Sequence, residues 1–259
     1  MLRVNNLASG SSGNATLVQH GSGSQSVNLL IDCGPGIRLL TQLIAQSGLE
    51  PEQVDGIFIT HEHSDHWGSV MKWQQRYGTP VWMSRGTWMA MGSPAFAGPL
   101  HWAHDSLPFT LKDGLEITPV TVPHDAREPL QLRCSNGSRD VGIVTDLGHS
   151  TLHLERAMQH CHALLVECNH DVDLLQQGPY PQALKHRVGG DWGHLSNAQA
   201  AGLVGRLNHP ELNWVMAAHL SAENNRPDLA QDSLSNTLNC SMDCIHVALQ
   251  NTPTGWVTV

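Results

Sequence analysis

Six apolar segments of this 259-residue chain each end at a side chain that can bind a metal ion. Segments of this kind, rich in β-branched residues, are typical of buried strands. Parallel strands of an α/β sheet bring their carboxyl ends to one edge, where ligands bind. One such strand end alone would indicate only a strand terminus, but six of them predict a site. The six side chains are Asp32, His61, His124, Asp146, Glu167 and His219.

The densest part of this pattern follows the predicted strand at 57–59, which runs directly into His61-Glu62-His63-Ser64-Asp65-His66. His61 and His63 are two residues apart, so they point the same way if the extended geometry persists. The alternative is a polar turn that happens to be rich in histidine. Each neutral imidazole needs hydrogen-bond partners when it is desolvated, so four metal-capable side chains in so short a loop favour a metal site.

The length of the chain and its alternation of predicted strands and helices predict one α/β domain over residues 1–259. Residues 9–14 predict a tight hairpin, with an anion-binding nest as the alternative, and Asn136-Gly137 predicts a second hairpin. Residues 92–104 predict a loop or insertion. Strands are expected at 2–7, 15–20, 27–31, 54–60, 80–83, 115–122, 130–134, 141–145, 163–166, 214–218, 245–249 and 256–259, and helices at 37–47, 69–77, 86–91, 150–159, 196–207 and 227–238.

Composition excludes several classes of protein. The sequence has no apolar stretch long enough to cross a membrane and no signal-peptide pattern at its start, so we expect a cytoplasmic protein without a membrane partner. Six cysteines without a CxxC pair predict buried free thiols. A formal charge of −9 is not the basic footprint of a strong nucleic-acid binder. A polyanionic substrate must therefore bind to a local basic patch or to the charge of bound metal ions.

The polar strand ends and the histidine cluster together predict a centre for two divalent cations. His61, His63 and His124 would hold one ion. Asp65, His66 and His219 would hold the other, with Asp146 as the bridge. Imidazole with carboxylate suits zinc, and manganese or iron stays possible. Two cations about 3.5–4 Å apart can share a hydroxide and stabilise both the attacking and the leaving oxygen of an in-line displacement.

Further polar residues are candidates for supporting roles. Asp32 is expected to hydrogen-bond the metal loop, or else to be a turn residue before Gly34-Pro35-Gly36. His194 precedes a capped helix and could contact a phosphate or protonate a leaving oxygen; the alternative is a surface loop histidine. Lys185, Arg187 and Ser196 could also contact phosphate, although short basic runs are usually solvated surface.

The motif Thr60-His61-Glu62-His63-Ser64-Asp65-His66, followed in order by His124, Asp146 and His219, resembles the metallo-β-lactamase superfamily. This resemblance implies a four-layer αββα sandwich with the metals at one edge of the paired sheets. Five further segments resemble the YycJ/WalJ-like branch, which is similar to phosphodiesterases such as RNase Z and is associated with DNA exonuclease activity. These segments are residues 7–15, 167–171, 178–181, 193–197 and 218–225.

The resemblance also implies roles for single residues. The loop of RNase Z-like enzymes that matches residues 193–196 carries a histidine near the scissile phosphate, which implies that role for His194. Glu167 and His170 match another active-site loop less closely. The chain has neither the tRNA-gripping arm of RNase Z nor a β-CASP insertion, which argues against tRNA maturation and RNase J-like activity. His63 stands where flavodiiron redox proteins usually have Glu, which favours hydrolysis.

The leading prediction is therefore a two-metal phosphodiesterase that acts on nucleic acid as a DNA exonuclease. A hydrolase of a small cyclic nucleotide fits the acidic charge better. Thioester or lactone hydrolysis could use the same cations, and only the loop of His194 favours hydrolysis of a phosphodiester instead. A non-catalytic binding scaffold is disfavoured by the complete set of ligands. Metal identity, cleavage polarity, oligomeric state and pathway do not follow from the sequence.

Overall fold

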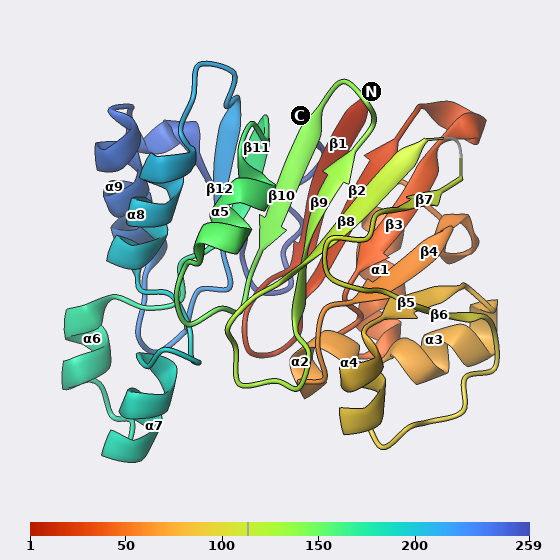
Figure 1. The fold of residues 1–259 in the computed structure, drawn as a ribbon, viewed down its shortest axis with the longest axis horizontal. Helices are drawn as coiled ribbons and strands as arrows, with labels where there is room; N and C mark the ends of the chain where they lie inside the picture. The colour runs from red at the N-terminus through yellow and green to blue at the C-terminus, as the bar shows by residue number, and fades with distance from the viewer. Residues whose placement is uncertain (113) are drawn as a thin grey trace.

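The computed structural model describes residues 1–112 and 114–259, which form two mixed sheets of seven strands each (Figure 1). The first sheet has the order β14 (Val257–Thr258), β1 (Leu2–Ala8), β2 (Ala15–His20), β3 (Val27–Ile31), β4 (Gly56–Ile59), β5 (Val81–Met83) and β6 (Leu100–Trp102). The second has the order β13 (Ile245–Val247), β12 (Trp214–Ala218), β11 (Ala163–Glu167), β10 (Asp140–Val144), β9 (Leu130–Ser135), β8 (Leu115–Thr121) and β7 (Phe109–Leu111).

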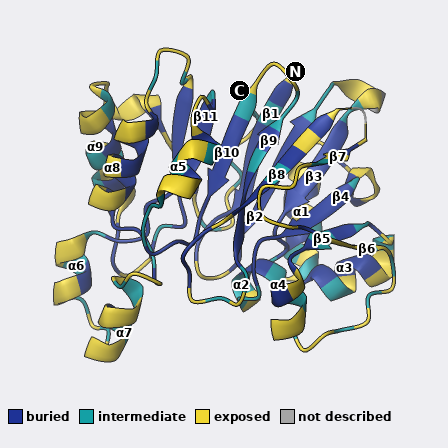
Figure 2. Cartoon of the chain, in the orientation of Figure 1, coloured by how far each residue is buried: buried dark blue, intermediate teal, exposed yellow. Residues whose placement is uncertain are grey.

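Strands such as β4 and β12 are continuously apolar because both faces of each sheet are covered there. Along β3, Leu29 and Ile31 join the core between the two sheets, whereas Leu30 packs into the core under the outer helices. On β4, Phe58 points between the sheets and its neighbour Ile57 points outward. Successive strand residues face opposite sides, so a strand with two buried faces shows no polar alternation. Figure 2 shows the resulting buried interior of both sheets.

Helices form the two outer layers (Figure 1). On the first sheet, α1 (Ile37–Gln46) and α3 (Val70–Tyr77) bury their apolar residues against the outer face. On the second, α5 (Leu152–Met158), α8 (Asn197–Leu207) and α9 (Pro227–Leu238) do the same. The predicted αββα sandwich is thus confirmed. The shorter elements are α2 (Ser64–Trp67), α4 (Arg85–Ala90), α6 (Val172–Gln177), α7 (Gln182–Val188), η1 (Gly23–Gln25), η2 (Pro51–Gln53) and η3 (Met242–Cys244).

The strands that end in polar residues all deliver them to one edge. β3 runs parallel to β4, and β10, β11 and β12 run parallel to one another. β8 has the direction of β10, because both pair antiparallel with β9. Asp32, Asp146 and His219 turn the chain sharply just beyond their strands, with φ of 63°, 54° and 55°. Such left-handed conformations cost roughly 1–3 kcal/mol each and persist only where surrounding contacts hold them.

Some local predictions were wrong. The loop expected at 92–104 contains the edge strand β6, and β7, α6 and α7 were not predicted at all. These elements are short and therefore show little periodicity. Their structure depends on the segments that pack against them. Cys240 and Cys244 are exposed, whereas the other four cysteines are buried free thiols as expected. Within the described ranges, no helix combines the length and the apolarity needed to cross a membrane.

Candidate metal centre

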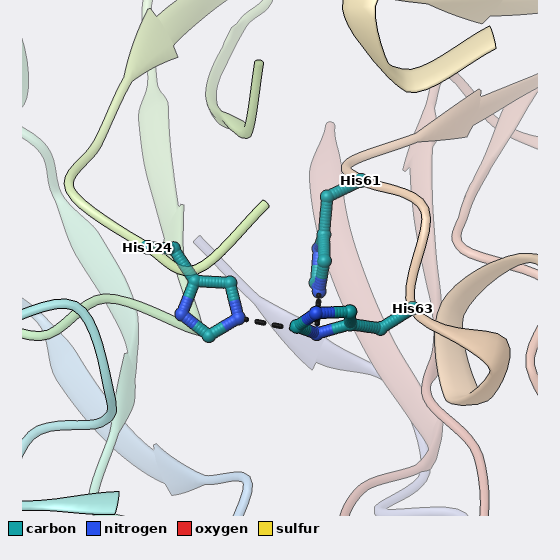
Figure 3. A group of neighbouring side chains, drawn as sticks. All are labelled: His61, His63 and His124. Atoms are coloured by element: carbon teal, nitrogen blue, oxygen red, sulfur yellow. Dashed lines mark hydrogen bonds between the residues drawn. The ribbon is translucent and has the colours of Figure 1, made fainter. Parts of the chain in front are cut away.

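Three imidazoles converge at the edge of the sandwich, two from the loop after β4 and one from the loop after β8 (Figure 3). His63 Nδ1 lies 3.0 Å from His61 Nε2 and 3.3 Å from His124 Nε2. One ring nitrogen from each residue lies within 4.8 Å of those of the other two. The structure therefore brings together the three side chains that the sequence assigns to the first cation.

Hydrogen bonds behind these rings fix which nitrogen faces the centre. His124 Nδ1 donates to Gly193 O at 2.9 Å, so Nε2 keeps its lone pair free. His61 Nδ1 lies 3.0 Å from Thr60 Oγ1, and that hydroxyl in turn donates to Asp32. Burial lowers the pKa of both His61 and His124. Burial therefore favours the neutral form of both rings, which is the form that binds a cation.

A second group surrounds Asp146. His66 Nε2 lies 3.2 Å from Asp146 Oδ2 and 3.5 Å from Asp65 Oδ2. His219 contacts the same carboxylates, with Nδ1 3.3 Å from Asp146 Oδ1 and Nε2 3.6 Å from Asp65 Oδ2. Potential ligand atoms lie within 4.8 Å of one another in Asp65, His66 and His219, in His61, His66 and Asp146, and in Asp146, Glu167, His194 and His219. Asp146 thus lies between the two groups, where the sequence predicts a bridge.

Two buried atoms of this group test whether a cation fits. Asp146 Oδ2 and His219 Nε2 have no hydrogen-bond partner. Buried polar atoms are almost always satisfied, and leaving one unpaired costs about 1–3 kcal/mol. Burial acts to lower the pKa of His219, but the charge of Asp146 and the neighbouring carboxylates of Asp65 and Glu167 raise it to about 10. A field that holds a proton on a buried imidazole also favours a divalent cation, so these residues fit one.

Asp32 holds the metal loop in place, which is the contact that its predicted supporting role requires. Its carboxylate accepts a hydrogen bond from His66 Nδ1 at 2.7 Å and from the Thr60 amide at 2.9 Å. Fixing Nδ1 turns His66 Nε2 toward the centre. The turn that follows Asp32 needs glycine, because a Cβ on Gly34 would lie 1.7 Å from the Asp65 carbonyl oxygen.

Glu167 connects His194 to the centre. Its Oε1 accepts hydrogen bonds from His194 Nδ1 at 2.7 Å and from His219 Nδ1 at 3.1 Å. Burial acts to raise the pKa of Glu167, but the charge of His194 and the bonds from both imidazoles lower it to about 2. The same carboxylate raises the pKa of His194 against the effect of burial. His194 is therefore held at the centre by a carboxylate that favours its protonated form, rather than lying free as a surface histidine.

A cavity of about 300 Å³ opens over the centre, with Asp65, Asp146 and His194 in its wall. Arg187 also lines this cavity, and its Nε donates to Asp125 Oδ2 at 2.5 Å. We call this space the catalytic cavity. An imidazole, a guanidinium and a cation centre around one small space are suited to binding and polarising an anionic ester.

Three of the predicted supporting residues lie outside the catalytic cavity. Lys185 is buried, and its Nζ donates to Gln176 O at 2.6 Å, so it cannot reach a phosphate. Ser196 caps α8 in a capping box with Gln199, which uses its hydroxyl. His170 is buried beside Ser196 through an isolated bridge and does not line the cavity. The structure therefore corrects the expectation of phosphate contacts from Lys185 and Ser196.

Sequence reasoning missed two residues beside the centre. Asn14 Nδ2 lies 3.2 Å from Asp65 Oδ2 and 3.1 Å from His66 Nε2. Asp125 Oδ1 lies 3.4 Å from His124 Nε2 and 3.6 Å from His63 Nε2. Asp125 could have been found, because it directly follows a predicted ligand. Asn14 carried no signal of its own beyond its place in the predicted hairpin at 9–14 and in the segment 7–15 that resembles the YycJ/WalJ-like branch.

Known proteins that the chain resembles agree with this geometry. The profile of the Metallo-beta-lactamase superfamily matches residues 8–158. The chain is 33% identical over 237 residues to exodeoxyribonuclease YycJ of Bacillus anthracis, with 90% of this chain and 87% of the relative covered. Its structure resembles the metallo-beta-lactamase fold protein YhfI of Bacillus subtilis, at 16% identity and a TM-score of 0.73 over 98% and 99% of the two chains. It also resembles the short form of human tRNase Z, at 13% identity and a TM-score of 0.64 over 97% and 98%.

Proposed function

The chain belongs to the metallo-beta-lactamase superfamily of hydrolases, and from this premise we propose that it is a two-metal phosphodiesterase that degrades DNA from an end. The observation that carries the proposal is the Glu167–His194 pair at the catalytic cavity. The thiolate of a thioester leaves without a proton, whereas the alkoxide that leaves a phosphodiester needs one. The name of the YycJ relative, an exodeoxyribonuclease, supports DNA as the substrate.

We assign each part of the centre a role in that reaction. Bound at the two groups of ligands, a pair of divalent cations would supply an activated water and neutralise charge on the phosphate. Asp32 and Glu167 orient the ligand imidazoles through Nδ1. His194, whose protonated form Glu167 favours through Nδ1, gives a proton to the leaving oxygen from its free Nε2.

Few groups of this acidic chain are placed to bind a polyanion. Arg187 is the one lysine or arginine in the wall of the catalytic cavity among the described residues. Asp125 holds its Nε, which leaves the guanidinium nitrogens Nη1 and Nη2 for a phosphate oxygen. A cavity of about 300 Å³ accepts roughly one nucleotide, not a duplex, so the end of a strand suits it better than an internal site.

A substrate screen on metal-loaded protein tests the proposal. End-labelled linear single strands and duplexes, circular single strands, 2′,3′-cyclic nucleotides and a thioester are compared. We expect hydrolysis of linear DNA and no cleavage of circles. Asp65→Ala should abolish hydrolysis with the fold retained, whereas Asp228→Ala, which removes an exposed carboxylate of α9, should not change it.

Each other outcome of the screen has a defined meaning. Preferential hydrolysis of cyclic nucleotides or of the thioester would replace DNA by that substrate. Cleavage of circles would establish an endonuclease. Fewer than one bound ion per chain, measured on the active preparation by elemental analysis, would contradict the metal centre itself.

A further inference from the structure

A second cavity, also of about 300 Å³, adjoins the catalytic cavity. The two share Ser11 and Ser221, so a ligand that extends beyond the centre on that side enters this space directly. None of the residues assigned to the cations lines the second cavity, and neither does His194. It therefore lies beside the reaction, away from the residue that serves the leaving group.

The wall of the second cavity differs in chemistry from that of the catalytic cavity. Its lining residues, all of them described, include no acidic, basic or histidine side chain. Hydroxyl and amide groups, such as those of Ser12 and Gln250, alternate there with apolar groups such as Leu220 and Leu249. A nucleoside has the matching chemistry, since its sugar and base edges form hydrogen bonds and its base presents a flat apolar face. A phosphate finds no cation there.

The wall of this cavity is fixed to the metal centre. Gln250 Oε1 accepts from the Ser12 amide at 3.1 Å, and its Nε2 donates to Gly13 O at 3.2 Å. Ser9 Oγ accepts from the His219 amide at 2.7 Å. Gly10 has a φ of 125°, and a Cβ there would lie 2.8 Å from Gln250 Oε1. A ligand that binds against this loop is consequently held at a fixed position relative to the metal centre.

We propose that the second cavity binds the nucleoside that lies on the side of the scissile phosphate away from His194. This inference rests on the proposed phosphodiesterase function and adds the substrate length to it. A substrate must then have at least two nucleosides to use both cavities. Binding is tolerant of sequence, because an apolar face and neutral hydrogen-bonding groups accept any base. A small cyclic nucleotide fills only one of the two spaces.

Two variants alter the second cavity at exposed positions, where folding is least at risk. Leu249→Ala removes apolar wall from a side chain that is 43% exposed, and Ala222→Trp fills the space. Leu152→Ala is the matched control, since Leu152 is 69% exposed and lies on α5. Thermal unfolding of each variant should match that of the unaltered protein.

The readout compares the dinucleotide TpT with methyl 4-nitrophenyl phosphate, whose methyl group is too small to fill a nucleoside site. For TpT, we expect both variants to raise KM about tenfold with kcat little changed. For the small ester, neither variant should change KM or kcat, and the control should change neither substrate. This split supports the inference.

Two results would overturn it. If both variants leave TpT hydrolysis unchanged, or slow both substrates equally, the second cavity binds no nucleoside and the phosphodiesterase proposal stands. If the unaltered, metal-loaded protein hydrolyses neither substrate, the proposed function fails and the inference falls with it.

Discussion

Replacing Glu167 by glutamine keeps the shape of a fully buried side chain but removes one of its acceptor atoms. Oε2 accepts from the amides of Leu147 and Leu195, at 3.1 and 3.0 Å, and Oε1 accepts from His194 and His219. The two backbone amides can only donate, so the glutamine oxygen must face them. Its NH2 group then faces the two imidazoles.

The Glu167→Gln substitution therefore changes which nitrogen of the His219 ring carries the proton. An amide N–H opposite His219 Nδ1 requires Nδ1 to accept, which moves the ring proton to Nε2. Nε2 is the atom that lies 3.6 Å from Asp65 and has no hydrogen-bond partner. A proton there occupies the lone pair that is predicted to bind the second cation.

The size of the effect follows from the lost bonds. A hydrogen bond to a charged group contributes about 1.5–3 kcal/mol. Removing a partner behind a metal ligand lowers metal affinity about 10- to 100-fold, which corresponds to roughly 1.4–2.8 kcal/mol. The two ranges agree, so we expect a loss of this size at the site of Asp65, His66 and His219. The site of His61, His63 and His124 keeps its affinity, because none of its rings contacts Glu167.

Competition with a chromophoric chelator measures both affinities. Glu155→Gln is the control, because Glu155 is also a hydrogen-bonded carboxylate, but it lies on α5 and binds Ser150 and Arg206. The control should match the unaltered protein. If Glu167→Gln binds both equivalents within threefold of the unaltered protein, the reasoning that Glu167 sets the His219 tautomer is refuted.

Three further predictions concern the turn, the acid and the guanidinium. Gly34→Ala should lower the free energy of unfolding by about 3 kcal/mol in chemical denaturation, because its Cβ would meet the Asp65 carbonyl, whereas Gly36→Ala, with no atom within 4 Å, should change it little. His194→Ala should lower kcat for phosphodiesters about 10²- to 10⁴-fold with metal content retained; unaltered turnover on every phosphodiester would remove the preference for phosphorus. Arg187→Gln should raise KM for DNA and lower the slope of log KM against log salt by about 1, and an unchanged slope would exclude a phosphate contact.

The site was more predictable from sequence than the smaller elements of the fold. The predicted ligands lie at the end of a buried strand or in the turn that follows it, and an apolar run that ends in His or Asp is a purely local signal. Sheet direction then brings these ends together. What the sequence could not provide was the mixed topology, in which β8 reaches the common edge only because it pairs antiparallel with β9. The direction in which two strands pair leaves no pattern within either strand.

The two basic residues of α7 show where local reasoning stops. Lys185 and Arg187 both fall in a short basic run, and both were predicted from it to contact phosphate. Residues two apart on a helix point in widely different directions, because each residue turns the helix by about 100°. Lys185 faces inward to Gln176, and Arg187 faces the cavity. Their orientation depends on how α7 packs, which required the structure.

The charges around the centre lead to a last prediction, that DNA binds only after the cations do. Five carboxylates lie around the centre, against one guanidinium and two imidazoles, those of His194 and His219, whose pKa the carboxylates raise. The metal-free centre is therefore negative on balance, and two divalent cations would reverse that balance. The carboxylates are those of Asp32, Asp65, Asp125, Asp146 and Glu167, and the guanidinium is that of Arg187.

In a chain of net charge −9, a polynucleotide that approaches the metal-free centre meets repulsion at close range. Fluorescence anisotropy of a labelled single strand, with His194→Ala to slow cleavage, should show at least about tenfold weaker binding after chelation. A methylphosphonate strand of the same sequence has no backbone charge, so its binding should not depend on metal. Equal binding of the charged strand with and without metal would show that groups outside the centre, rather than the cations, attract the DNA.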